Sequence, residues 1–164
     1  MVPTLRDALN AEGWRSVLDV PKVTPVFRTE PALLLPAWSG RGHRPTTLVL
    51  APEAQPAQTV EALAASLPAA AWQALTVAEG AQGPRTSLFV AKRVWESRAG
   101  LPGRPGRLLL RRNLDGREAR YSRSNAPADT AALTLAQVAA TRWIIETAFK
   151  TAKGETGLDE YEVR

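Results

Sequence analysis

The residues best suited to chemistry stand near the end of the chain, where one carboxylate lies between two cations. Arg142 stands four residues before Glu146, and Lys153 stands seven residues after it. Helical residues are about 100° apart, so these side chains would fall within about 40° of arc. This charged triad suits a site that handles metal ions and phosphates. The alternative is a surface ladder of ion pairs, each worth about 0.2–0.5 kcal/mol.

The element that must position the charged triad is predicted to be a helix that starts near Thr134. Thr134 and Gln137 match a capping box, and Gly154 is a natural C-cap. The apolar stripe of this helix consists of Leu135, Val138, Ile145, Phe149 and Ala152. We expect the triad to flank this stripe, so that its side chains emerge at the edge of the core.

The segment from Trp72 to Asn125 is predicted to be a small, mostly antiparallel β unit. Its strand-like segments are Ala74–Ala78, Arg85–Glu96, Gly106–Asn113 and Arg117–Ser124. Turn signals separate them at Gln82-Gly83-Pro84, at Leu101-Pro102-Gly103 and at Asp115-Gly116, of which the last is a strong hairpin signal.

The first part of the chain reads as alternating short helices and extended pieces. We predict a helix at Thr4–Glu12, a strand at Trp14–Val20 and a second helix at Gln58–Leu67, which Pro68 ends. Prolines break the extended segment Thr24–Leu35. The predicted fold class is therefore mixed, α+β.

Composition excludes several classes of protein. Apolar residues make up 45% of 164 residues, so the chain should fold, and no segment reads as a membrane span or signal peptide. Cys is absent and His43 is the one histidine, which excludes thiolate zinc sites and histidine metal clusters. The net charge of +5 is compatible with a phosphate-backbone partner. An arginine-rich genome of high GC content would give the same bias.

The charged triad resembles the C-terminal signature of insertion-sequence transposases of the DDE, RNase H-like superfamily, in the insertion-sequence-four-like group. That signature is Tyr–x2–Arg–x3–Glu–x6–Lys. Further segments resemble the seven-oh-one branch of these elements, in the expected order. They are WRSVLDVPKVTPVF at Trp14, PAWSGRGHRP at Pro36, FVAKRVWES at Phe89, LLLRRNLDG at Leu108, RYSRSNAPADT at Arg120 and KGETGLDEYEVR at Lys153.

The resemblance implies the C-terminal part of an RNase H-like catalytic domain, with a β-rich antiparallel insertion and a long C-terminal helix. Residues 1–23 would be a partial core, residues 24–128 the insertion with one helix, and residues 129–164 the helix with the third acid. In this family three acids bind two Mg²⁺ or Mn²⁺ ions that cleave and transfer DNA strands. Glu146 would be a catalytic metal ligand, and Arg142 and Lys153 would contact DNA phosphates.

Two departures from the family pattern affect the expected activity. Ala139 stands where the signature has tyrosine, and the family's first two aspartates are expected before this sequence begins. Asp7 and Asp19 match no family motif, and we interpret both as solvated. We therefore expect a truncated transposase that is inactive alone.

Three further sets of residues are candidate contacts with DNA. Trp95 would stack on an extruded base or pack in the core. Arg111 and Arg112 would meet phosphates or keep a hairpin edge soluble. The basic loop Ser39–Pro45, with Arg41, His43 and Arg44, would bind DNA or be solvated.

The predicted partners are DNA at transposon ends and a full-length transposase, in a bacterial cytoplasm and at the nucleoid when DNA is bound. No membrane partner is expected. Two alternatives stay open: a non-catalytic DNA-binding or dimerising module, and a decayed gene whose product is unfolded or never made.

Overall fold

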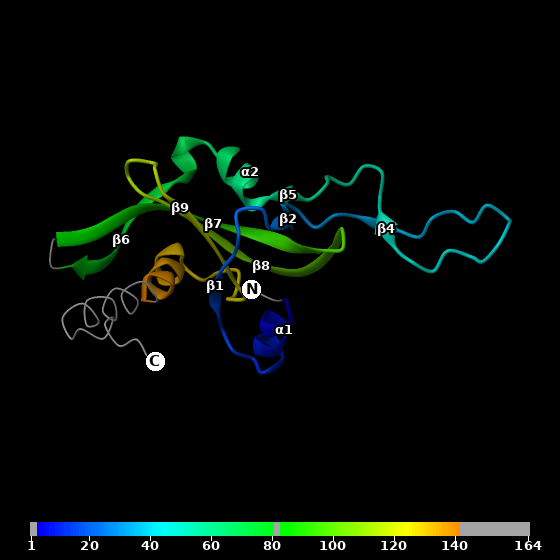
Figure 1. The fold of residues 1–164 in the computed structure, drawn as a ribbon, viewed down its shortest axis with the longest axis horizontal. Coiled ribbons are helices and arrows are strands. Elements are labelled where there is room, and N and C mark those ends of the chain that lie inside the picture. The colour runs from blue at the N-terminus through cyan, green and yellow to red at the C-terminus, as the bar shows by residue number, and fades with distance from the viewer. Residues whose placement is uncertain (1–2, 81–82, 142–164) are drawn as a thin grey trace, which may run out of the picture.

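The computed structural model describes residues 3–80 and 83–141, which form a mixed α/β fold around a curled antiparallel sheet (Figure 1). The sheet has seven strands in the order β1-β9-β8-β7-β2-β5, and β6 pairs with β7. Its strands are β1 (Val17–Asp19), β2 (Pro25–Phe27), β5 (Gln58–Thr59), β6 (Gln73–Gly80), β7 (Gly83–Arg98), β8 (Leu101–Arg112) and β9 (Ala119–Ser124). The predicted α+β class is thus confirmed at the level of a mixed fold.

The long strand β7 organises the sheet. It pairs with β8 along one edge, and with β6 and then β2 along the other. The β7–β8 hairpin turns at Ala99 and Gly100, which both have positive φ. The predicted turn at Leu101-Pro102-Gly103 is therefore wrong, because β8 already begins at Leu101. The predicted hairpin at Asp115-Gly116 is confirmed, with the Gly116 amide donating to the Asn113 carbonyl at 2.9 Å.

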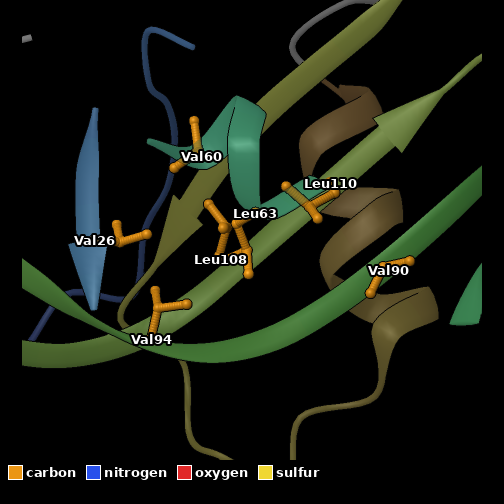
Figure 2. Close-up of a cluster of buried hydrophobic side chains, with 7 residues drawn as sticks. All are labelled: Val26, Val60, Leu63, Val90, Val94, Leu108 and Leu110. Atoms are coloured by element: carbon orange, nitrogen blue, oxygen red, sulfur yellow. The ribbon is translucent and has the colours of Figure 1, made fainter. Parts of the chain in front are cut away.

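One face of the sheet is covered by α2 (Val60–Ala65). Side chains from α2, β2, β7 and β8 form its core, as Figure 2 shows: Val26, Val60, Leu63, Val90, Val94, Leu108 and Leu110. The helix begins two residues later than predicted because Gln58 and Thr59 pair with β2 as β5. Thr59 caps the helix by accepting a hydrogen bond from the Ala62 amide at 3.1 Å.

The opposite face of the sheet is covered by a helix that begins at residue 132 and is described as far as residue 141 (orange in Figure 1). Leu135 and Ala136 of this helix are buried against Phe89 and Leu109. The predicted capping box is wrong, because Thr134 lies two residues inside the helix. Leu135 belongs to the apolar stripe as predicted, but Val138 is 51% exposed.

Two elements extend from the sheet. Helix α1 (Pro3–Ala11) precedes β1, and β1 pairs with β9, so Val17–Asp19 belongs to the same sheet as the later strands. A small second sheet of β3 (Leu33–Leu34) and β4 (Val49–Leu50) forms an arm that projects from the body (Figure 1). Within residues 3–80 and 83–141, no helix is long and apolar enough to cross a membrane.

Candidate nucleic-acid interface

The predicted catalytic and DNA-binding residues Arg142, Glu146 and Lys153 lie outside the described residues. The structure does place Ala139, which stands at the position of the signature tyrosine. Ala139 lies on the C-terminal helix and lines a cavity of about 40 Å³ beneath it, together with Phe89 and Leu109. The small side chain thus leaves space between this helix and the sheet.

Four arginines share the face of the sheet on which the C-terminal helix lies. Phe89 and Leu109 are buried against this helix, so they identify the side of β7 and β8 that faces it. Side chains alternate along a strand, so every second residue from Phe89 or Leu109 lies on the same side. Arg93 of β7, Arg107 and Arg111 of β8 and Arg120 of β9 stand in the same alternation. We call these four residues the arginine face.

The arginines of this face stand opposite one another in pairs. Arg93 is the cross-strand partner of Arg107, and Arg111 is the cross-strand partner of Arg120. Like charges directly opposite each other in a sheet are destabilising. An arrangement that places two such pairs on one face therefore fits a surface that meets an anionic partner.

Arg111 is the most enclosed residue of the arginine face. Its guanidinium is half-buried and donates to the Ser87 hydroxyl at 3.3 Å and to the Asn113 side-chain oxygen at 3.4 Å. Burial lowers the pKa of Arg111, and nearby Glu118 counteracts part of this effect. The side chain stays charged at neutral pH, so it carries a charge with two long hydrogen bonds.

Two hollows lie between the arginine face and the C-terminal helix. Arg111 and Arg120 line the small cavity beneath Ala139, together with Asp19. Arg111 also lines a larger hollow of about 360 Å³, bordered by Arg85 and Ala140. Arg111 thus lines both hollows, next to the last described turn of the helix. Arg142 follows Thr141 directly in the sequence.

The predicted stacking residue Trp95 lies on the same face of β7 as Arg93. The Arg93 guanidinium lies 5.1 Å from the centroid of the Trp95 ring. Trp95 is half-buried and belongs to neither hydrophobic cluster of the described residues, which disfavours the core interpretation. Its stacking on an extruded base stays a prediction.

Arg112 lies on the opposite face of the sheet from its neighbour Arg111. Its guanidinium packs over the Trp72 ring, 4.2 Å from the centroid. Strand β8 has β7 on one side and β9 on the other, so the alternative of a charged hairpin edge is wrong. A contact between Arg112 and DNA stays a prediction, but Arg112 is no part of the arginine face.

The basic loop Ser39–Pro45 lies in the projecting arm, between β3 and β4. Arg41, His43 and Arg44 are exposed, and the Arg44 guanidinium lies 5.3 Å from the centroid of the Trp38 ring. DNA binding by this loop stays a prediction.

Asp7 and Asp19 both have protein partners. Asp7 accepts a paired hydrogen bond from Arg98 at 2.6 and 2.9 Å, and its side chain is partly exposed, in agreement with the interpretation of a solvated residue. Asp19 is exposed and accepts a hydrogen bond from the Ser122 hydroxyl at 2.7 Å. Among the described residues, no group of three or more histidines or acids could hold a metal ion.

Sequence reasoning identified Arg111 but missed Arg93, Arg107 and Arg120. Each belongs to a predicted strand, and the alternation of apolar residues assigns each to a face. The missing information was the register between the strands. The Asp115-Gly116 turn alone would have indicated that Arg111 faces Arg120.

No family of known proteins matches this chain, and neither curated proteins nor solved structures give a match.

Proposed function

We propose that this chain binds double-stranded DNA through the arginine face. The observation that carries the proposal is the pair of opposed arginines Arg93–Arg107 and Arg111–Arg120. Glu118 accepts a hydrogen bond from Arg120 Nε at 2.9 Å and offsets part of the charge of the second pair. Phosphates would relieve the repulsion that remains, because guanidinium groups form paired hydrogen bonds with phosphate oxygens. DNA supplies such phosphates at regular spacing along its backbone.

We further propose that the chain is part of a DDE transposase of the seven-oh-one branch, with an RNase H-like core. This part of the proposal rests on the sequence resemblance. The arginine face lies beside the helix described to residue 141, and Arg142 and Glu146 come after that helix in the sequence, which supports this part of the proposal. Trp95 would then stack on a base that the enzyme has extruded.

Residues 3–80 and 83–141 contain no group of carboxylates that fits a two-metal centre. Two Mg²⁺ or Mn²⁺ ions need several carboxylates that bridge or flank them. Asp19 is the carboxylate that lines the cavity beside Arg111, and it is engaged by Ser122. Glu146 and Asp19 are too few for two ions. We therefore propose DNA binding without strand cleavage by this chain alone.

The proposal is tested by fluorescence anisotropy with a labelled DNA duplex. The variant Arg93→Gln/Arg107→Gln removes one opposed pair, and it should weaken binding by about 2–3 kcal/mol or more. The control Arg28→Gln/Arg117→Gln removes the same charge from exposed positions outside the strands of the sheet. Equal losses in the two variants, or no binding by the wild type, would contradict a specific arginine face.

A further inference from the structure

A second group of arginines lies where α1 approaches the ends of β7, β8 and β9. Arg6, Arg98, Arg104 and Arg123 line a cavity of about 240 Å³, which Asn10, Ser16 and Asn125 also border. Arg123 stands on the opposite side of β9 from Arg120 of the arginine face, and Arg104 lines the same cavity as Arg123. This arginine pocket is therefore a separate site.

Glu96 is the buried centre of the arginine pocket. It is 6% exposed, and three arginines contact it: Arg6 at 3.0 Å, Arg98 at 3.0 Å and Arg123 at 3.1 Å. A charge held this deeply requires paired partners, which these arginines supply. Gly106 makes room for the arrangement, because a Cβ there would lie 3.1 Å from Arg123 Nε.

The pocket holds more positive charge than its carboxylates neutralise. Glu96 and Asp7 are the acids in contact with these arginines, and both of them engage Arg98. Four arginines thus share two carboxylates. Two buried nitrogens of Arg6, Nε and Nη1, have no hydrogen-bond partner among the described residues.

We propose that the arginine pocket binds a phosphate group. A phosphate dianion matches the charge that remains, and the arginine side chains that line the cavity can donate hydrogen bonds to its oxygens. A cavity of about 240 Å³ holds a phosphate with several waters or with part of the molecule that carries it.

The test is calorimetric titration with inorganic phosphate at constant ionic strength. The wild type should bind phosphate with a dissociation constant below about 1 mM. Arg104→Gln should weaken binding by about tenfold or more, and Arg104 is exposed, so this variant should fold. Arg117→Gln, an exposed arginine outside the pocket, should bind as the wild type does. Absence of saturable binding, or equal affinity in wild type and Arg104→Gln, would overturn the proposal.

The source of the phosphate is identified by competition with oligonucleotides. If a terminal phosphate is recognised, a 5′-phosphorylated oligonucleotide displaces inorganic phosphate and the same oligonucleotide without it does not. If backbone phosphate is recognised, both compete equally. Both outcomes support the site, whereas phosphate binding that neither oligonucleotide affects would overturn nucleic acid as the source and leave free phosphate as the ligand.

Phosphate binding by the arginine pocket and duplex binding by the arginine face can be tested separately. Arg93→Gln/Arg107→Gln should bind inorganic phosphate within about twofold of wild type. Loss of phosphate binding in Arg104→Gln with phosphate binding retained in Arg93→Gln/Arg107→Gln supports two sites, whereas loss of phosphate binding in both variants would overturn the separate pocket.

Discussion

At the scale of single residues, the role of an arginine depends on its face and its partners rather than on its position in the sequence. Arg111 and Arg112 are neighbours, yet they lie on opposite faces of β8. Arg112 packs on Trp72, whereas Arg111 stands opposite Arg120 with two long hydrogen bonds. The first arrangement stabilises the fold, and the second is available to a partner.

The two neighbours therefore make a matched pair of variants. Arg112→Gln should lower the free energy of unfolding by about 1 kcal/mol through loss of the contact with Trp72, and it should weaken duplex binding less than Arg111→Gln does. Arg111→Gln should weaken duplex binding with little loss of stability, because it removes a repulsive cross-strand pair. Urea denaturation and anisotropy separate the effects. Equal weakening of DNA binding in both variants would contradict the assignment to faces.

A cleavage assay with the wild type and Glu146→Gln tests the proposal that this chain does not cut DNA. With Mn²⁺ and duplex DNA, we expect no strand cutting by the wild type, because two-metal chemistry needs more carboxylates than Glu146 and Asp19 provide. The measurement is a gel assay of end-labelled DNA. Cutting that disappears in Glu146→Gln would show that the metal centre is complete without further polypeptide.

At the scale of elements, the strands were predictable, but their register was predictable only at the Asp115-Gly116 hairpin. Alternating apolar residues and the Asp115-Gly116 turn identified β6 to β9. The turn at Ala99-Gly100 was missed because Ala99 adopts a positive φ, which its sequence does not favour. Helix starts also shifted, since β5 pairs before α2 and Thr134 lies inside its helix. Long-range pairing decided these positions, and it also decided which arginines meet.

The ion pair between Arg6 of α1 and Glu96 of β7 makes the free energy of unfolding depend on pH. Burial on its own raises the pKa of Glu96, but Arg123, Arg6 and Arg98 outweigh it and hold the pKa below the ordinary value of 4.5. The carboxylate therefore stabilises the fold fully above pH 4.5, and this contribution is lost as pH falls below 4.5 through the lower folded value. Urea denaturation between neutral and acid pH should show this loss.

The control for this pH dependence is Glu96→Gln. The variant should be less stable at neutral pH by about 3–5 kcal/mol, because buried arginines lose their partner. Its stability should also fall less steeply below pH 4.5. An equally steep acid loss in wild type and variant would assign the effect to other carboxylates.

At the scale of the whole molecule, the seven-stranded sheet carries a hydrophobic cluster on each face, and the arginine face lies on one of them. The α2 face holds the larger hydrophobic cluster, and the other face combines the C-terminal helix with the arginine face. The fold class was accessible from the sequence, because patterning fixes strands and helices. The pairing of β1 with β9 could not be predicted from the sequence, because it joins residues more than a hundred positions apart.

This architecture predicts a cooperative unit. Two hydrophobic clusters on one continuous sheet should unfold in a single transition, with the same midpoint by circular dichroism and by tryptophan fluorescence. A gradual transition, or different midpoints for the two signals, would favour the alternative of a decayed gene product that does not fold.

The salt dependence of duplex binding tests the central claim most directly. The slope of log affinity against log salt concentration counts the phosphates that the protein neutralises. We predict a steep slope for the wild type that falls by about two in Arg111→Gln/Arg120→Gln, one unit for each lost phosphate contact. A slope that is the same in wild type and variant would contradict DNA binding by the arginine face.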